Sequence, residues 1–258
     1  MTVFAMSPDG VRIALHELGD PDGAPVLLIH GFSSNAQRNW IDTGWSGALA
    51  EAGLRGIAMD LRGHGDSGRP TTGYEVPRFL DDVDAVLEQL MLDEPPGAIG
   101  YSMGARLLWR HAGTRTLAFR ALVLGGLPAG DPFQRFDLDL ALRAMAGEAE
   151  AGPTESFVVD LAGVFPEHDP ATLVHLAAEV SDSLFDPEQA PPTAPTLLMT
   201  GDRDTRAPDS ASLVPLLADG RFAPIPGRNH MNAPTSGAFR REATAFLAAR
   251  LRGDAAAA

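Results

Sequence analysis

One short stretch of the chain has the clearest potential for chemistry: Gly100-Tyr101-Ser102-Met103-Gly104. An apolar run precedes this stretch, and the residues after it have the character of a helix. A serine between two glycines at a tight strand-to-helix turn is held at the tip of the turn, with its hydroxyl facing outward. Because a serine hydroxyl is a weak nucleophile at neutral pH, it requires a base, usually a histidine oriented by a carboxylate. Ser102 is therefore a candidate nucleophile that needs two partners.

The C-terminal part of the chain contains two residues with the types and positions expected of those partners. Asp204 lies in the turn after an expected strand, Pro195–Thr200. His230 lies after the last expected strand, Arg221–Ile225. In an open α/β sheet, ligands bind at the carboxyl ends of the strands, so residues at these exits converge on one region. We therefore predict that Ser102, Asp204 and His230 form a catalytic triad.

The elements that would position this triad follow an α/β pattern. Short apolar segments alternate with longer stretches of helical periodicity, which predicts a mainly parallel sheet with helices on both faces. The expected strands are Val3–Ala5, Val11–Glu17, Pro25–Ile29, Gly56–Asp60, Ala98–Tyr101, Ala121–Leu124, Pro195–Thr200 and Arg221–Ile225. The helices expected around the sheet are Trp45–Ala52, Val76–Leu90, a helix after Ser102, and Phe239–Leu251.

This alternation stops between residues 127 and 194, where only helices are expected. They are Phe133–Ala146, Thr154–Val164 and Asp169–Val180, with Asp169 as the N-cap of the last. The pattern predicts a core of residues 1–126 and 195–258 with a helical cap inserted at 127–194.

The composition excludes several kinds of chemistry. The chain of 258 residues contains no cysteine, and all 20 basic residues are arginine, so disulfides, thiolate nucleophiles and lysine Schiff bases are excluded. A formal charge of −14 argues against nucleic acid and anionic membrane surfaces as partners. Residues 1–10 have no signal-peptide pattern, and no apolar run is long enough to span a membrane, so we expect a cytoplasmic protein.

The histidines other than His230 have no ligand-like spacing with carboxylates, so we expect no metal and no cofactor. This interpretation covers His16, His111, His168 and His175. His64 lies between glycines in a turn, and we interpret it as structural. We expect His30 to pack or to form hydrogen bonds within its loop.

Five motifs together resemble those of α/β-hydrolases with a helical cap. They are His30-Gly31-Phe32, Asp60-Leu61-Arg62-Gly63-His64-Gly65, Gly100-Tyr101-Ser102-Met103-Gly104, Gly201-Asp202-Arg203-Asp204 and His230. The resemblance implies that the acid is the fourth residue of Gly-x-x-Asp, which is Asp204. Asp202 in the same turn is the competing candidate. Asp131 is a third, because some members of the family place the acid after the preceding strand.

The resemblance also implies an oxyanion hole made of two backbone N–H groups. One belongs to Met103, the residue after the nucleophile. The other belongs to Phe32, which follows His30-Gly31.

Large apolar residues of the 127–194 segment and of the strand exits are candidates for the substrate pocket. Arg106, one helical turn after Ser102, is expected to form a structural salt bridge or to bind a substrate anion. The second possibility arises because Gly-Tyr-Ser-x-Gly-x-Arg also resembles the elbow of menaquinone-pathway lyases of this fold. The candidate substrate-binding residues are Phe32, Trp40, Tyr101, Arg106, Phe133, Phe136, Phe157, Phe165, Phe185 and Met231.

The leading functional hypothesis is a serine hydrolase that cleaves small neutral carboxylic esters or lactones through an acyl-enzyme. The neutral substrate is expected because the 127–194 segment has 13 acidic residues and two arginines, and its net charge of −11 would repel anions. A C–C bond hydrolase or menaquinone-pathway-type lyase with the same triad is the alternative. A ligand receptor without catalytic activity is a third hypothesis, from a different class.

Overall fold

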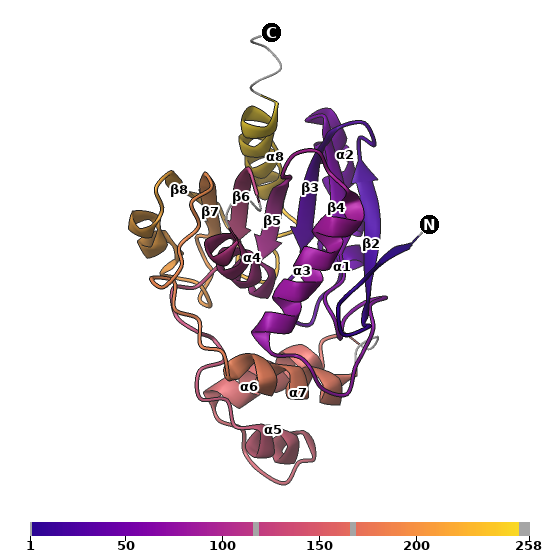
Figure 1. Ribbon diagram of the computed structural model, residues 1–258. Helices are drawn as coiled ribbons and strands as arrows, with labels where there is room; N and C mark the ends of the chain where they lie inside the picture. Colours follow the sequence, from indigo (N-terminus) through magenta and orange to yellow (C-terminus); the bar gives the residue numbers. More distant parts are fainter. Residues whose placement is uncertain (1, 116–118, 166–168, 253–258) are drawn as a thin grey trace.

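A computed structural model describes residues 2–115, 119–165 and 169–252, and its centre is one eight-stranded sheet (Figure 1). The strand order is β1-β2-β4-β3-β5-β6-β7-β8; β3 to β8 pair in parallel, whereas β1 and β2 pair antiparallel. This confirms the predicted mainly parallel sheet. The strands are β1 (Val3–Met6), β2 (Arg12–Gly19), β3 (Ala24–Ile29), β4 (Leu54–Met59), β5 (Gly97–Tyr101), β6 (Ala121–Gly125), β7 (Thr196–Gly201) and β8 (Gly220–Ile225).

Helices cover both faces of this sheet because its central strands are apolar on both faces. On β3, Leu27 and Ile29 pack into one core cluster, with α3 (Val76–Leu90) and α4 (Met103–Thr114). The alternate residues, Val26 and Leu28, pack into a second cluster with α2 (Trp45–Glu51) and α8 (Gly237–Leu251). The remaining helices outside the 127–194 segment are α1 (Ala36–Asn39), η1 (Ile41–Thr43), α2 (Trp45–Glu51), η2 (Ser210–Leu216) and α8 (Gly237–Leu251).

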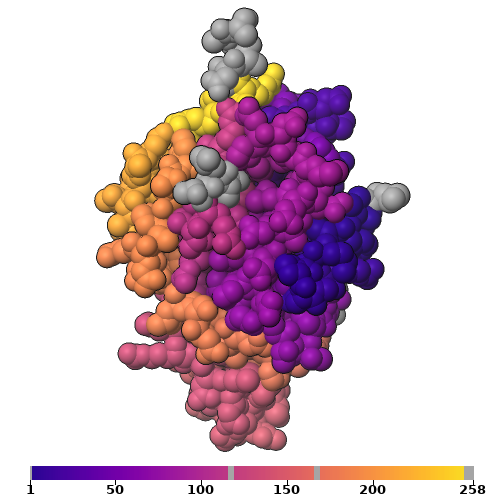
Figure 2. Space-filling view, viewed as in Figure 1, coloured from indigo at the N-terminus to yellow at the C-terminus, as the bar shows by residue number. Residues whose placement is uncertain are grey.

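The 127–194 segment contributes α5 (Leu138–Met145), α6 (Pro153–Ala162) and α7 (Pro170–Ser181), between β6 and β7. These helices lie beyond the carboxyl ends of β5 and β6, and α5 is the farthest from the sheet (Figure 1). Figure 2 shows the part around α5 as a pink lobe at the lower end of the molecule. Among the described helices, none is long and apolar enough to cross a membrane.

Two expected helix starts in this segment have different outcomes. The helix expected from Phe133 begins only at Leu138, because Arg135 has a φ of +63° and Asp137 is the N-cap. The cap at Asp169 is confirmed, since its carboxylate accepts a hydrogen bond from the Thr172 N–H at 3.1 Å. Glu167 and His168 lie outside the described residues.

Asp60, directly after β4, anchors the glycine-rich loop that follows it. Its carboxylate accepts hydrogen bonds from the N–H groups of Ala36 at 2.7 Å and Asp66 at 2.9 Å, and contacts His16 Nε2 at 3.1 Å. Burial raises the pKa of Asp60, but these hydrogen bonds and His30 outweigh burial and lower the pKa to about 2. Gly65 is required beside it, because a Cβ there would lie 2.2 Å from the Asp60 carboxyl carbon.

We expect Asp60 to make the protein sensitive to acid. Its pKa in the folded state is about 2 against an ordinary 3.8, so its contribution is complete above about pH 4 and is lost as the pH falls through 2. This group accounts for about 2 kcal/mol of the free energy of unfolding. Asp60→Asn should be less stable at pH 7 and should lose less stability between pH 4 and pH 2, as measured by urea unfolding. Parallel pH dependences for the two proteins would contradict this account.

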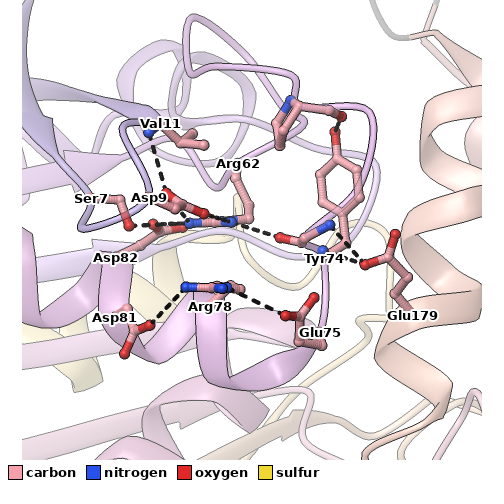
Figure 3. A network of polar contacts seen from close by, with 12 residues as sticks. Ser7, Asp9, Val11, Arg62, Tyr74, Glu75, Arg78, Asp81, Asp82 and Glu179 are labelled. Carbon is pink, nitrogen blue, oxygen red and sulfur yellow. Dashed lines mark hydrogen bonds and ion pairs between the residues drawn. The ribbon is translucent and has the colours of Figure 1, made fainter.

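A buried arginine in the same loop joins three parts of the core (Figure 3). The fully buried Arg62 side chain donates to both carboxylate oxygens of Asp82 on α3, at 2.6 and 2.7 Å. It also donates to Asp9 in the turn between β1 and β2, at 2.9 Å, and to the Gly73 carbonyl at 2.6 Å. The N–H of Gly73 in turn donates to Glu179 on α7, at 2.9 Å, so this network reaches the 127–194 segment.

Breaking this buried pair should be far more destabilising than breaking the exposed pairs beside it. Asp82→Asn leaves a buried guanidinium with only part of its counter-charge, and we expect a loss of about 3 kcal/mol in urea unfolding. Arg78, in the same region of α3, forms half-exposed ion pairs with Glu75 and Asp81. Arg78→Gln is the matched control and should cost less than about 1 kcal/mol. Equal losses for the two variants would contradict the role of burial.

Candidate active site

Ser102 lies at the tip of a strained turn between β5 and α4. Its φ is +51°, a region that residues with a Cβ rarely adopt, and its N–H donates to the Gly125 carbonyl at 2.8 Å. The flanking glycines permit the turn. A Cβ on Gly100 would lie 2.6 Å from the Gly104 carbonyl oxygen, and one on Gly104 would lie 2.3 Å from the Ile29 carbonyl oxygen.

The three residues expected to meet at the strand exits form one chain of hydrogen bonds. His230 Nε2 lies 2.9 Å from Ser102 Oγ, and His230 Nδ1 lies 2.8 Å from Asp204 Oδ2. In the tautomer that satisfies both contacts, Nδ1–H donates to the carboxylate and Nε2 accepts from the serine hydroxyl. This arrangement leaves the Nε2 lone pair of His230 directed at the serine hydroxyl.

The Asp204 carboxylate is held in its charged form. Its Oδ1 accepts from the N–H groups of Arg206 at 2.9 Å and Ala207 at 3.1 Å, which leaves Oδ2 for His230. Burial raises the pKa of Asp204, but the hydrogen bonds from His230 and the backbone outweigh burial and lower the pKa below its ordinary value.

The two other candidate acids have different partners. Asp202 is exposed, and its Oδ1 accepts from the Gly227 N–H at 2.7 Å, which joins the exit turns of β7 and β8. Asp131 Oδ2 pairs with Arg106 Nη2 at 2.8 Å. The geometry therefore favours Asp204 as the partner of His230.

The loop that carries His230 is fixed by contacts that sequence reasoning missed. The Tyr101 hydroxyl donates to the His230 carbonyl at 2.6 Å, and the two rings lie 5.4 Å apart. Burial raises the pKa of Tyr101 well above its ordinary value, so its hydroxyl stays a donor. Asn229 Oδ1 accepts from the N–H groups of Met231 and Asn232, each at 3.1 Å. The pattern Asn-His-Met-Asn was the available signal for this turn, because asparagine side chains bond readily to nearby backbone.

The two backbone groups expected to form an oxyanion hole are available. The N–H groups of Phe32 and Met103 have no hydrogen-bond acceptor among the described residues. Both residues line the cavity that contains Ser102. Met103 is the first residue of α4, so its N–H is one of the free donors at a helix N-terminus.

A cavity of about 250 Å³ opens at Ser102, and most of the expected substrate-binding residues line it. They are Phe32, Tyr101, Arg106, Phe133, Phe157, Phe165, Phe185 and Met231.

Two of the expected residues do not line the cavity, and for them the prediction was wrong. Trp40, the C-cap of α1, is fully buried in the second core cluster, where its ring lies edge-on to that of Trp45 on α2 at 5.2 Å. Phe136 packs on the core at the turn that precedes α5, where the expected helix is absent.

Arg106 has the structural partner that one of our two interpretations expected. Its two terminal nitrogens pair with the two oxygens of Asp131, at 3.0 and 2.8 Å, and Nη2 also donates to the Ser183 carbonyl at 2.6 Å. Asp131 further accepts from the N–H groups of Phe133 and Phe185 at 2.9 and 2.7 Å. The pair is buried and fixes the backbone of two phenylalanines that line the cavity.

The histidines interpreted as structural have internal partners. His30 Nδ1 lies 2.8 Å from the Gly31 carbonyl, and its Nε2 accepts from the Leu61 N–H at 3.0 Å. His64 is placed similarly, between the Arg62 carbonyl and the Ser33 N–H.

One cluster that could hold a metal was missed by the sequence analysis. His16, Asp60 and Asp66 have ligand-type atoms within 4.8 Å of one another. His16 and Asp60 are hydrogen-bonded to each other, and Asp60 also accepts the Asp66 N–H. These contacts explain the cluster as the anchor of the glycine-rich loop.

Known proteins resemble this chain in both sequence and structure. The chain is 37% identical to the probable oxidoreductase EphD of Mycobacterium tuberculosis over 116 residues. This matched region covers 43% of this chain and 18% of that protein. It is also 37% identical to the non-heme chloroperoxidase CPO-A1 of Kitasatospora aureofaciens over 124 residues. This matched region covers 46% of this chain and 42% of that protein. The chain thus spans less than half the length of these curated relatives.

A solved esterase from Exiguobacterium antarcticum has the same fold, with a TM-score of 0.74 at 22% identity over 98% of this chain and 100% of the esterase. The family model for the alpha/beta hydrolase fold matches residues 24–169, which run from the start of β3 to the N-cap of α7. With more than half of its length matched and the sheet order and strained serine turn described above, the chain belongs to the alpha/beta hydrolase fold family.

Proposed function

We propose that this protein is a serine hydrolase that cleaves carboxylic esters through an acyl-enzyme on Ser102. The observation that carries the proposal is the continuous hydrogen-bonded chain from Asp204 through His230 to Ser102. The two curated relatives bear the names of different activities, so the proposal depends on the site itself. The esterase of the same fold is consistent with it.

Each group has a defined task in this mechanism. His230 removes the Ser102 proton as the hydroxyl oxygen attacks the ester carbonyl, and Asp204 stabilises the resulting imidazolium. The N–H groups of Phe32 and Met103 donate to the tetrahedral oxyanion. His230 then gives the proton to the departing alcohol oxygen. Water, deprotonated by His230 in the second half of the cycle, releases the carboxylic acid and restores Ser102.

The cavity supports an ester with a substantial apolar part. Four phenylalanines of the 127–194 segment contribute to its lining, and Leu127 and Leu161 add aliphatic surface. Apolar walls of this kind bind the hydrocarbon part of a ligand, while a few polar groups orient its reacting bond.

The expected preference for neutral esters loses its physical basis in this cavity. That expectation relied on the acidic residues of the 127–194 segment, but no aspartate or glutamate of the described chain lines the cavity. Three arginines line it instead: Arg38, Arg106 and Arg206. C–C bond hydrolysis or a lyase reaction with the same triad remains a second candidate function. Enzymes of these two kinds act on acidic substrates, and the arginines of the cavity would suit such substrates.

We expect Ser102→Ala and His230→Ala each to lower ester turnover by about 10⁴-fold or more, with little change in melting temperature. Their side chains lie at a cavity and not in the packed core. A fluorophosphonate probe should label the parent protein and should not label Ser102→Ala. Ser212→Ala, an exposed serine on η2, is the control and should label normally. Normal turnover of p-nitrophenyl esters by Ser102→Ala would refute the mechanism.

Asp204→Asn should lower kcat by about 10⁴-fold, because an amide can hold His230 in the wrong tautomer and cannot stabilise the imidazolium. Asp202→Asn should change kcat less than about tenfold, since an amide oxygen can still accept the Gly227 N–H. Steady-state kinetics on one ester would decide between them. The reverse ranking would assign the acid to Asp202.

A further inference from the structure

The charged side chains that line the cavity are opposite in sign to the net charge of the whole protein. The chain has 34 acidic residues and 20 arginines, yet the described residues that line the cavity include arginines and no carboxylate. The arginines come from three separate places: Arg38 from α1, Arg106 from α4 and Arg206 from the turn after β7. A cavity that selects against anions would not be lined in this way.

Four acidic residues of the 127–194 segment accept hydrogen bonds from the backbone. Asp137 and Asp169 accept hydrogen bonds as helix N-caps, and Glu155 accepts from the Asp137 N–H at 2.9 Å. Glu179 accepts from the N–H groups of Gly73 and Tyr74. These carboxylates stabilise the segment and its contact with the core, and none of them lines the cavity.

The three arginines are not equivalent. Arg106 is neutralised by Asp131, as described above. Arg38 stacks over the Phe165 ring with its guanidinium carbon 4.0 Å from the centroid. Arg206 stacks over the Phe157 ring at 4.3 Å, and no carboxylate of the described chain lies within ion-pair distance of it. Stacking on Phe157 holds the planar guanidinium in place while leaving its N–H groups free for a ligand.

A second polar group at the cavity is also unsatisfied. Asn39, at the end of α1, is 5% exposed and lines the cavity, and no side chain or backbone group of the described residues forms a hydrogen bond with its side-chain amide. The Asn39 amide atoms are not fully buried, so a ligand or water in the cavity can reach them. The cavity therefore combines apolar walls with free hydrogen-bond donors, among them a cation.

From this arrangement we propose that Arg206 forms an anion-binding subsite, and that the substrate is an ester which carries a carboxylate at a distance from the scissile bond. The proposal rests on the ester hydrolase function proposed above. A carboxylate matches the planar fork of one guanidinium, which can donate two parallel hydrogen bonds to it. The apolar walls would bind the hydrocarbon between the carboxylate and the ester.

The test compares matched esters that differ only in charge. 4-Nitrophenyl hemiglutarate and 4-nitrophenyl pentanoate probe the acyl side, and 4-carboxyphenyl acetate and 4-carbamoylphenyl acetate probe the alcohol side. For each pair, kcat/KM is measured at low and high salt for the parent protein, Arg206→Gln and Arg203→Gln. Arg203 is the matched control, because it is an exposed arginine of the same turn that does not line the cavity.

In the parent protein, we expect the anionic member of at least one pair to have the higher kcat/KM at low salt. Arg206→Gln should reduce the ratio of anionic to neutral kcat/KM in that pair by about tenfold, mainly through KM, which is the usual effect of losing a hydrogen bond to a charged group. Arg203→Gln should leave the ratio unchanged. A ratio that Arg206→Gln does not lower in either pair, or that Arg203→Gln lowers equally, would overturn the subsite.

The subsite and the ester hydrolase function can fail independently. Turnover of the neutral esters together with an unchanged ratio in Arg206→Gln would refute the subsite and leave the ester hydrolase intact. If no ester is turned over and Ser102 resists the fluorophosphonate, the ester hydrolase function fails. Calorimetric binding of pentanoate and of neutral pentanamide to the parent protein and to Arg206→Gln then tests the subsite. The subsite requires that the parent prefer pentanoate and that Arg206→Gln lose this preference.

Discussion

The turn at Ser102 is the constraint on which the rest of the site depends. Its left-handed backbone places the hydroxyl above the carboxyl end of β5 and starts α4 immediately after it. Such a turn is unfavourable by about 1–3 kcal/mol, so the surroundings must hold it. They do so by close packing: Gly104 lies against the Ile29 carbonyl on β3, and the Ser102 N–H donates to Gly125 on β6. Ser102 is thus fixed by the two strands, β3 and β6, that flank β5.

The parallel sheet brings the other groups to the same place. β7 and β8 end beside each other, so the turns after them hold Asp204 and His230 at adjacent positions along the edge of the sheet. The backbone of each turn is bonded to the other, through Arg203 N–H to the Arg228 carbonyl at 3.0 Å and through Asp202 to Gly227. The exposed Asp202 therefore has a structural role close to Asp204, the hydrogen-bond partner of His230.

The sequence contained enough local information for the sheet, the serine turn and the residues that meet there. These features depend on short motifs, in which glycines and strand exits limit the backbone to few conformations. The cavity walls were harder to predict, because a phenylalanine in a helix gives no sign of which neighbour it faces. Trp40 illustrates this: it follows the four-residue α1, and it packs against Trp45 of α2 and not toward the cavity. The start of α5 was missed because helix propensity at Phe133 does not reveal the left-handed residue Arg135.

Net charge was the least reliable guide, for a physical reason. A formal charge summed over a segment treats every carboxylate as free, whereas a carboxylate that accepts backbone N–H groups is oriented by them. Asp131 shows the consequence most directly. It accepts from Phe133 and Phe185 and pairs with Arg106, so one acidic residue orders the cavity wall and cancels one cation. The field that a ligand meets is set by the groups left over after such pairing. Among the described residues that line the cavity, the charged side chains other than His230 are arginines, inside a protein whose total charge is −14.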